Sequence, residues 1–304
     1  MSSEWITLSK EFAEATAKAG AHTVAVHAES RGSASGVVWR PGTIVTAEHA
    51  LQRDEEIRVT LPDGQIAEAK LAGRDPSTDV AVLKCEQAKD CVTSFSDTAA
   101  LLPGNVTLVV GRTRASGPVA ALGFVSMVAG ERRLWGGSLL SPYVRLDVAL
   151  QRTAVGGAVI DAEGRVAGLA TPKFAYTGAL ALPVPTVDRV VKALLEKGSV
   201  PRGYFGVGLQ PVRLPENLRE TLQRKEKTAA MILEVEPGGP AHKAGVVIGD
   251  ILVAVNGKPV TRLEDVWAHL IGENIGHSVN AQFLRGGAPR EVSITVGERP
   301  NGGA

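Results

Sequence analysis

Short β-type runs of mostly apolar residues dominate the chain from residue 23 to residue 171. Valine and isoleucine are frequent in these runs, and glycine, proline, aspartate or asparagine separates one run from the next. Many short strands at such intervals are typical of an all-β barrel or sandwich and not of alternating β-α units. The predicted strands cover 23–28, 34–39, 42–47, 56–61, 67–73, 79–85, 106–111, 121–130, 143–149, 157–161 and 165–171.

Helical periodicity flanks this β-rich region on both sides. Residues 9–20 predict a short helix with Ser9 as its N-cap and Gly20 at its end. A second helix is predicted over 186–198, where Gly198 supplies the C-terminal stop. Its apolar face consists of Val187, Val190, Val191, Leu194 and Leu195.

A different order of elements follows a short linker. Strands are predicted at 205–212, 230–236, 250–257, 278–285 and 290–296, with helical segments at 240–245 and 263–272. We therefore expect a first domain over 1–198, a linker over 199–203 and a mixed α/β module over 204–300, which are ordinary domain sizes.

Charge and composition exclude several classes of function. Lys and Arg total 33 against 32 Asp and Glu, so no broad basic surface for nucleic acid or anionic lipid is expected. No run approaches the roughly 18 apolar residues of a membrane span, so we expect none. The first residues carry neither the basic nor the apolar part of an export signal. As written, the chain is expected in the cytoplasm, or in the periplasm if a leader was removed.

Neither cysteines nor histidines indicate a metal or cofactor site. Cys85 and Cys91 could only close a small loop, and two free thiols without a catalytic part are expected. No pair among the six histidines has metal-ligand spacing. We therefore expect no metal and no cofactor.

Three segments of the first domain could together form a catalytic site. His49 follows a predicted strand, Asp79 precedes another, and Gly156 and Gly157 lie in a loop before a third. Each has an ordinary alternative: a packed or surface histidine, a strand-entry aspartate, or a glycine pair in a bulge or hairpin. In this order they match the triad of chymotrypsin-type proteases, where a carboxylate fixes the tautomer of the base beside the nucleophile.

The segments around these residues resemble the HtrA/Deg family of trypsin-like proteases. The resemblance covers residues 35–171 and is carried by "ASGVVWRPGTIVTAEHAL", "DPSTDVAVLK" and "LDVALQRTAVGGAVIDAEGRVAGLAT". It implies a mainly β fold, a chymotrypsin-like double β-barrel. It also aligns His49 with the general base of the family and Asp79 with the carboxylate that orients it.

The same resemblance aligns Val155 with the nucleophilic serine. Where the family usually has Gly-Asn-Ser-Gly-Gly-Pro, this chain has Thr153, Ala154, Val155, Gly156, Gly157 and Ala158. A valine side chain has no oxygen that His49 could deprotonate. Thr153 replaces the glycine that donates one oxyanion-hole N–H, so we expect the oxyanion loop, residues 153–156, to be altered as well. A rescuing hydroxyl from Ser138, Ser141 or Thr153 is the alternative.

The C-terminal module resembles a PDZ domain of the HtrA type over residues 203–297. The matching segments are "RGYFGVGLQPV", "ILEVEPGGPAHKAGVVIGDILVAVNGKPV" and "LEDVWAHLIG". The resemblance implies an α/β fold that takes a peptide as an added strand and binds its terminal carboxylate through backbone N–H groups. The implied peptide-binding residues are Phe205, Gly206, Val207, Leu209, Val266 and Leu270. Val266, Trp267 and Leu270 could instead face the core, and the whole module could merely pack on its neighbour.

Three hypotheses follow from these patterns. The first is an inactive HtrA-like protein that binds protein C-termini or unfolded polypeptide as a scaffold, sensor or chaperone. The second is an active serine endopeptidase of protein quality control that uses an unrecognised nucleophile. The third is a structural subunit with an idle groove. HtrA proteins commonly form trimers through N-terminal aromatic residues, so a homotrimer through Trp5 and Phe12 is a further expectation.

Overall fold

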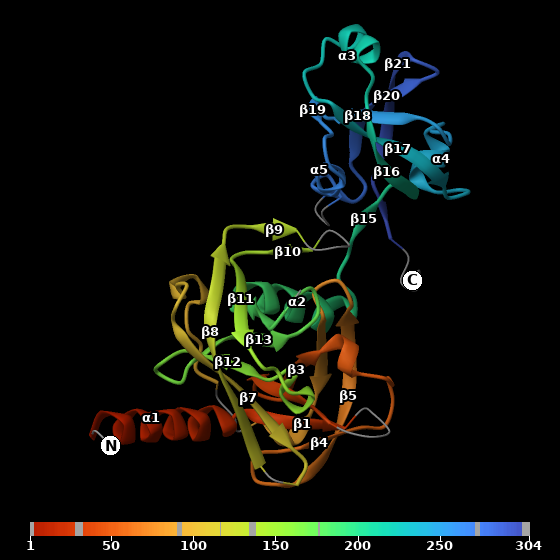
Figure 1. Ribbon diagram of the computed structural model, residues 1–304. Coiled ribbons are helices and arrows are strands. Elements are labelled where there is room, and N and C mark those ends of the chain that lie inside the picture. The colour runs from red at the N-terminus through yellow and green to blue at the C-terminus, as the bar shows by residue number, and fades with distance from the viewer. Residues whose placement is uncertain are drawn as a thin grey trace. The chain divides into compact units, whose positions relative to one another are not determined.

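The computed structural model describes residues 3–27, 33–89, 93–115, 117–133, 138–175, 177–270 and 274–299. The backbone divides into two compact units, Met1–Val200 and Pro201–Ala304 (Figure 1). The first unit is mainly β, and the second is a smaller α/β unit.

Two closed antiparallel barrels form most of the first unit, as the resemblance to trypsin-like proteases implies (Figure 1). The interior of the first barrel is filled by residues such as Val24, Ile44 and Leu83. Its strands follow the spatial order β1-β2-β3-β6-β5-β4, with β1 (Thr23–His27), β2 (Ala34–Arg40), β3 (Thr43–Ala47), β4 (Ile57–Thr60), β5 (Ile66–Asp75) and β6 (Val80–Lys84).

The second barrel has its own interior, to which Val109, Val144 and Leu146 contribute. Its spatial order is β11-β14-β13-β12-β7-β8, with β7 (Val106–Thr113), β8 (Gly117–Ala129), β11 (Tyr143–Val148), β12 (Ala158–Ile160), β13 (Val166–Thr171) and β14 (Ala179–Pro183). A small hairpin of β9 (Arg132–Arg133) and β10 (Leu139–Leu140) lies outside the barrel. Short 3-10 turns occur at η1 (Glu48–Ala50), η2 (Glu86–Ala88), η3 (Thr98–Ala100) and η4 (Arg152–Ala154).

The two barrels share a third apolar cluster with helix α2 (Val184–Lys197). Trp39 of the first barrel, Leu169 of the second and Val190 of α2 all belong to this cluster. The predicted apolar face of α2 is confirmed, and Gly198 ends the helix with a φ of 71°. Since glycine adopts positive φ without a steric penalty, the C-terminal stop is also explained.

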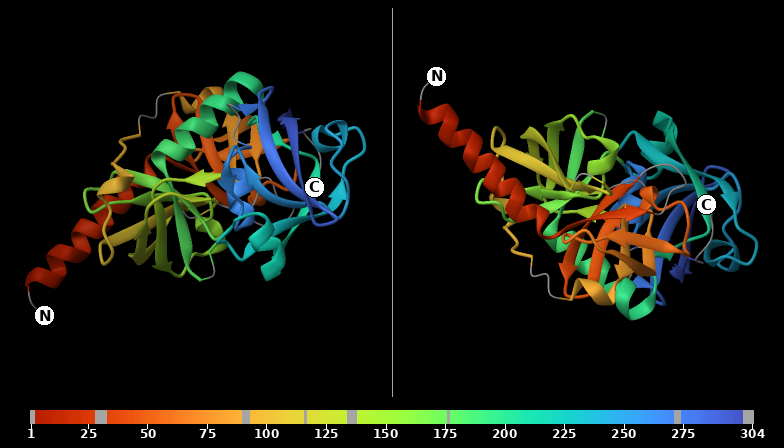
Figure 2. Two further views of the ribbon diagram at one scale, coloured as in Figure 1. Left: turned by 90° about the horizontal axis from the view of Figure 1, so that it is seen from above. Right: turned by 90° about the horizontal axis from the view of Figure 1, so that it is seen from below.

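The N-terminal helix α1 (Ser3–Gly20) is longer than predicted. Ser9 lies within it and is not the N-cap, so that prediction is wrong. The helix already begins at Ser3, where Glu4 lies in the first turn and complements the positive end of the helix dipole. Figures 1 and 2 show its N-terminal half extending away from the barrels.

Five strands in the order β16-β17-β18-β20-β21 form the main sheet of the second unit, and β19 pairs with β18. The predicted hairpin at Gly286 and Gly287 joins β20 and β21. The helix predicted over 263–272 ends at Trp267. Beyond it, the His269 N–H donates to the Val266 carbonyl and the Leu270 N–H to the Trp267 carbonyl, three residues back rather than the four of an α-helix. Residues 271 and 272 lie outside the described residues. The elements are β15 (Gly203–Tyr204), β16 (Val207–Arg213), α3 (Glu216–Thr221), β17 (Thr228–Val235), α4 (Pro240–Lys243), β18 (Ile251–Val255), β19 (Lys258–Pro259), α5 (Leu263–Trp267), β20 (Ser278–Arg285), β21 (Ala288–Thr295) and β22 (Gly297–Glu298).

The loop between β11 and β12, both of the second barrel, contacts the first barrel at Gly156. Gly156 has a φ of 76°, and a Cβ there would clash with the Ser35 carbonyl oxygen and lie 2.7 Å from the Ala47 nitrogen. Both atoms are backbone of the first barrel, so neither can move aside independently. The first glycine of the pair is therefore required by close packing between the barrels as well as by its backbone conformation.

Replacing Gly156 by alanine should destabilise the first unit strongly. Alanine at positive φ costs about 1–2 kcal/mol, and the clash with Ser35 should add at least about 2 kcal/mol to the loss of unfolding free energy. Gly64→Ala is the matched control, because Gly64 has a φ of 88° with no atom within 4 Å of an added Cβ. Urea unfolding of both variants would test this, and equal losses would contradict the packing explanation.

Candidate functional site

His49 and Asp79 lie together at one end of the first barrel. His49 is in η1, directly after β3, and Asp79 immediately precedes β6. The His49 ring donates from Nδ1 to the Asp79 carboxylate, with both oxygens at 2.8 Å, and the His49 backbone N–H donates to Oδ1 at 3.0 Å. This contact leaves Nε2 as the imidazole nitrogen available to face a reactant.

The Asp79 carboxylate is fully buried and well hydrogen-bonded. Thr171 of β13 donates its hydroxyl to Oδ2, so the second barrel contributes to the same site. The Lys173 ammonium lies 3.8 Å from Oδ1. Asp79 also has a φ of 60°, an uncommon conformation for a residue other than glycine, which is maintained by these surrounding contacts.

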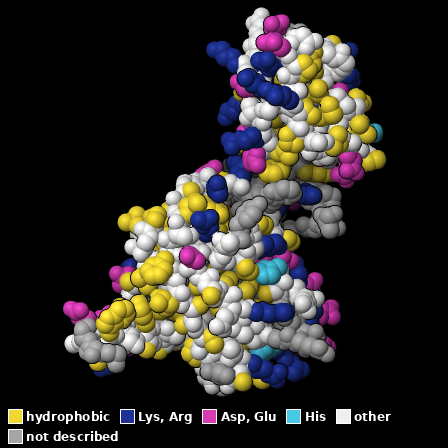
Figure 3. Space-filling model, in the orientation of Figure 1, with side chains coloured by type: hydrophobic (Ala, Val, Ile, Leu, Met, Phe, Trp, Pro, Cys, Tyr) yellow, Lys and Arg dark blue, Asp and Glu magenta, His cyan; other side chains and the backbone are white. Residues whose placement is uncertain are grey.

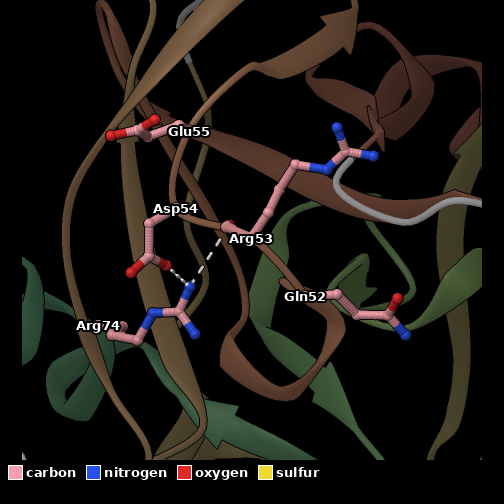
Figure 4. A pocket seen from close by; sticks show the side chains of 5 residues that line it. All are labelled: Gln52, Arg53, Asp54, Glu55 and Arg74. Atoms are coloured by element: carbon pink, nitrogen blue, oxygen red, sulfur yellow. Dashed lines mark hydrogen bonds and ion pairs between the residues drawn. The ribbon is translucent and has the colours of Figure 1, made fainter.

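Ion pairs link η1, the 3-10 turn that contains His49, to neighbouring segments. Glu48, next to His49 in η1, lies 3.3 Å from the Lys173 ammonium and 3.4 Å from the Arg74 guanidinium. Arg74 also pairs with Asp54 at a shallow polar hollow of about 540 Å³, lined by Gln52, Arg53, Asp54, Glu55 and Arg74 (Figure 4). Because its lining is polar and charged, the hollow lacks the apolar walls usual in small-molecule sites.

Val155, the residue aligned with the nucleophile, is only 6% exposed. It packs in a small apolar cluster with Ala34, Ala47 and Ala50. Ala47 directly precedes η1, which contains His49, and Ala50 is the last residue of η1. Among the residues that the structure describes, no hydroxyl is hydrogen-bonded to the His49 ring at Nε2. The only side-chain partner of the imidazole in that part of the chain is the Asp79 carboxylate.

The backbone around Val155 forms a closed 3-10 turn. The Val155 N–H donates to the Arg152 carbonyl at 3.2 Å, and the Ala154 N–H donates to the Gln151 carbonyl at 2.9 Å. The Thr153 carbonyl accepts a hydrogen bond from the Ser35 hydroxyl at 2.5 Å. In trypsin-like proteases the oxyanion hole uses the N–H of the nucleophilic residue. The corresponding N–H here already has an acceptor within its own turn.

The alternative hydroxyls considered from the sequence lie elsewhere. Ser138 contacts the hydroxyl of Ser77, and Ser77 in turn bonds to Asp75. Thr153 is part of η4, where its carbonyl is bonded to Ser35. Ser141 precedes Pro142 in the segment between β10 and β11. None of these residues is hydrogen-bonded to His49 in the described structure.

Two residues at this site were not recognised in the sequence. Thr171 is one of several threonines that end a strand, and nothing in the local pattern distinguishes it. Ser35 is a small residue within a predicted strand and is equally inconspicuous. Their contacts with Asp79 and Thr153 depend on how the two barrels meet, which only the tertiary structure reveals.

In the second unit, the segment predicted to bind a carboxylate has unpaired N–H groups. The carbonyls of Phe205 and Gly206 each accept a hydrogen bond of 2.8 Å, from Ala241 and Glu236. In the described structure neither Phe205 nor Gly206 donates its own N–H to an acceptor. Gly206 has a φ of 73°, so adjacent N–H groups form a concave arrangement suited to an anion.

A partly buried apolar strip continues from this loop along β16. Val207 and Leu209 pack partly against the core, as do Leu263 of helix α5, which lies beside β16, and Leu270 just after that helix. Val266 is fully buried in that core, and Trp267 is half-buried. The sequence-predicted peptide-binding residues are thus brought together, although Val266 lies beneath the surface.

Cys85 is a buried free thiol, and burial raises its pKa. Cys91 lies outside the described residues. In the described part of the chain, no cluster of three or more histidine, cysteine or acidic residues is arranged to bind a metal. No helix there combines the length and apolar character that a membrane span requires.

Two protein families match successive parts of the chain. The trypsin-like peptidase domain family matches residues 34–169, which include most strands of both barrels but neither β1 nor β14, and the PDZ domain family matches residues 203–296.

Curated relatives match most of this chain over about half of their own length. The probable periplasmic serine endoprotease DegP-like of Bartonella henselae is 32% identical over 265 residues, 85% of this chain and 52% of that protein. The protein of that name from Halomonas elongata is 30% identical over 283 residues, 90% of this chain and 58% of that protein. The chain therefore spans about half the length of the curated relatives it matches.

Solved structures match nearly the whole chain. A serine endoprotease from Yersinia pestis has a TM-score of 0.74 at 28% identity, covering 95% of this chain and 98% of that chain. The HtrA-type protease AlgW with a decapeptide has a TM-score of 0.75 at 23% identity, covering 95% and 99%. With a trypsin-like peptidase domain followed by one PDZ domain, this chain belongs to the HtrA/DegP family.

Proposed function

We propose that this protein is a proteolytically inactive HtrA-type protein that binds the C-terminal ends of other polypeptides, or unfolded segments, through its PDZ domain. Such a protein would act as a scaffold, sensor or chaperone. The observation that carries the proposal is the packing of the Val155 hydrocarbon side chain where a nucleophilic hydroxyl would be required. The expected loss is large, since removal of the triad serine alone costs subtilisin about 10⁶-fold in turnover.

The hydrogen-bonding of the closed turn supports the same proposal independently of the side chain. A Val155 N–H that donates to Arg152 is not free to stabilise an oxyanion. Loss of one such donor typically costs about 10²–10³-fold in turnover. Both the nucleophile and the electrostatic stabilisation are therefore compromised.

An active serine endopeptidase is the second candidate, and the geometry of His49 and Asp79 favours it. Their contact at 2.8 Å is the arrangement that a general base requires. A fluorophosphonate probe that labels the wild-type protein at any serine or threonine of the first unit would establish this candidate instead.

The relatives support the proposed partners and compartment without defining them. One similar structure carries a decapeptide and another a tripeptide, which supports peptide ligands for this PDZ domain as well. The periplasmic location in the names of the curated relatives supports the periplasm rather than the cytoplasm for this chain.

Restoring a serine alone should not restore proteolysis. We expect Val155→Ser to leave casein hydrolysis at the wild-type background, because the N–H of residue 155 would still donate to Arg152. The combined variant Thr153→Gly/Ala154→Asn/Val155→Ser should exceed the single variant by at least about 100-fold, since it also relaxes the turn. Adding His49→Ala to the combined variant is the control and should abolish the gain. Casein hydrolysis by the single variant that exceeds background and equals that of the combined variant would show that the turn opens without help.

Peptide binding should depend on a free C-terminal carboxylate. We expect the tetrapeptide Ala-Val-Ala-Val to bind the full chain at least about tenfold more tightly as the free acid than as the amide, because hydrogen bonds to a charged group contribute about 1.5–3 kcal/mol. Gly206→Ala should weaken binding, since an added Cβ would lie 3.2 Å from Glu236 Oε2. Gly238→Ala, at a similar φ with no atom within 4 Å, is the matched control. Equal binding of acid and amide by calorimetry would argue against the carboxylate loop.

We also propose that the protein assembles with copies of itself, as a homotrimer. On α1, Trp5 is 69% exposed and Ile6 50%, and on the outer face of β8, Leu122 is 52% exposed and Phe124 50%. Figure 3 shows hydrophobic side chains gathered on one face over α1 and the neighbouring barrel. Exposed apolar patches of this kind are typical of association surfaces.

Light scattering should give the mass of three chains at micromolar concentration. Trp5→Ser should lower that mass, because it removes an exposed aromatic side chain from the association surface. Ile66→Ser is the matched control, since Ile66 is 54% exposed on β5. A monomeric wild-type protein would exclude the proposed assembly.

A further inference from the structure

Strand β16 is an edge strand, and the direction of its backbone groups can be assigned. It is the first strand in the order of its sheet, and in the described part of the chain only β17 pairs with it. The Gly206 carbonyl accepts from the Glu236 N–H, and the Leu214 N–H donates to the Lys227 carbonyl, each at 2.8 Å. Both contacts point toward β17, and both involve even-numbered residues.

The odd-numbered residues of β16 therefore point their N–H and C=O groups to the open edge, because these directions alternate along an antiparallel strand. The register shift near Gly208 does not disturb this alternation. Gly208 faces Glu234 and Leu209 faces Ile232, so the extra residue belongs to β17. The hydrogen bonds on the two sides of the shift, at Gly206 and at Leu214, both involve even-numbered residues that face β17.

Pro211 occupies one of the outward-facing positions, and it is exposed. Proline has no N–H, and its ring fills the space where a carbonyl of a neighbouring strand would accept from that N–H. Val207 and Leu209 can exchange backbone hydrogen bonds with an added peptide, whereas Pro211 can only accept one. The open edge of β16 thus offers a short ladder that is interrupted after Leu209.

We propose that Pro211 sets the length of peptide that this PDZ domain recognises. The inference rests on the proposed peptide-binding function and specifies it. With the terminal carboxylate at Phe205 and Gly206, the last peptide residue lies opposite Val207 and the third from last opposite Leu209. Two residues further on, the peptide meets Pro211, so about four C-terminal residues are recognised and no residue upstream of them completes a pair of ladder bonds.

Calorimetry with two peptides and two proline variants tests this proposal. The probes are the tetrapeptide Ala-Val-Ala-Val and a decapeptide in which Thr-Ala-Thr-Ala-Thr-Ala precedes the same four residues. Valine suits the apolar strip formed by Val207, Leu209 and Leu270. In the wild-type full chain, the two dissociation constants should agree within about twofold.

Pro211→Ala should let the longer peptide continue the ladder. We expect its affinity for the decapeptide to rise about fivefold to tenfold, the effect of one or two additional backbone hydrogen bonds. Its affinity for the tetrapeptide should stay within about twofold of wild type, which also shows that the groove remains folded. Pro259→Ala, at an exposed proline of β19, is the matched control and should behave as the wild-type protein.

Each result decides between the proposal and its alternatives. A wild-type chain that binds the decapeptide at least fivefold more tightly than the tetrapeptide would show pairing beyond Pro211. If the Pro211→Ala chain binds both peptides equally, Pro211 does not limit peptide length, and its role is confined to protecting the free edge of β16 from aggregation. Either result overturns the inference but leaves peptide binding intact. Absence of binding by both peptides to both proteins would instead overturn the proposed function, and this inference with it.

Discussion

The hydrogen bonds of Ser35 are the constraint on which the candidate active site depends. Its N–H donates to the Val155 carbonyl at 2.8 Å, and its carbonyl accepts from the Thr46 hydroxyl at 2.6 Å. Its hydroxyl donates to the Thr153 carbonyl and accepts from the Arg112 N–H. One buried residue of the first barrel therefore holds two carbonyls, those of Thr153 and Val155, in the turn that the second barrel contributes. Close approach at Gly156 completes this contact, since no larger residue fits against the Ser35 carbonyl.

Retention of His49 and Asp79 has a structural explanation that requires no catalysis. The Asp79 carboxylate is completely buried, and a buried carboxylate without partners is costly. The His49 ring and backbone, together with the Thr171 hydroxyl, satisfy it from both barrels. Removing the histidine would leave buried acceptors unpaired, so the pair stabilises the junction between the barrels even when no substrate is present.

The accuracy of the sequence predictions depended on whether local or tertiary interactions determine each feature. Most barrel strands, helix α2 and its Gly198 stop follow from local periodicity and were predicted. The start of α1 was predicted incorrectly at Ser9, because the exposed turns before it carry apolar residues such as Trp5 that do not face the core. The resemblance to the family predicts that a valine stands at the position of the nucleophile. The closed turn around it could not be predicted, because its hydrogen bonds to Ser35 depend on how the two barrels meet.

Catalysis and peptide binding depend on different parts of the chain, so the absence of one side-chain hydroxyl is compatible with a protein that still binds peptides. Acyl transfer needs one particular oxygen beside the imidazole, so a hydrocarbon side chain at position 155 would remove the chemistry while the barrels still pack. Peptide capture at an edge strand uses backbone N–H and C=O groups, which nearly every residue supplies. Proline is the exception, since it alone lacks the donor. At β16 a single proline would thus limit recognition through the backbone, just as Val155, directly after η4, would limit catalysis through its side chain.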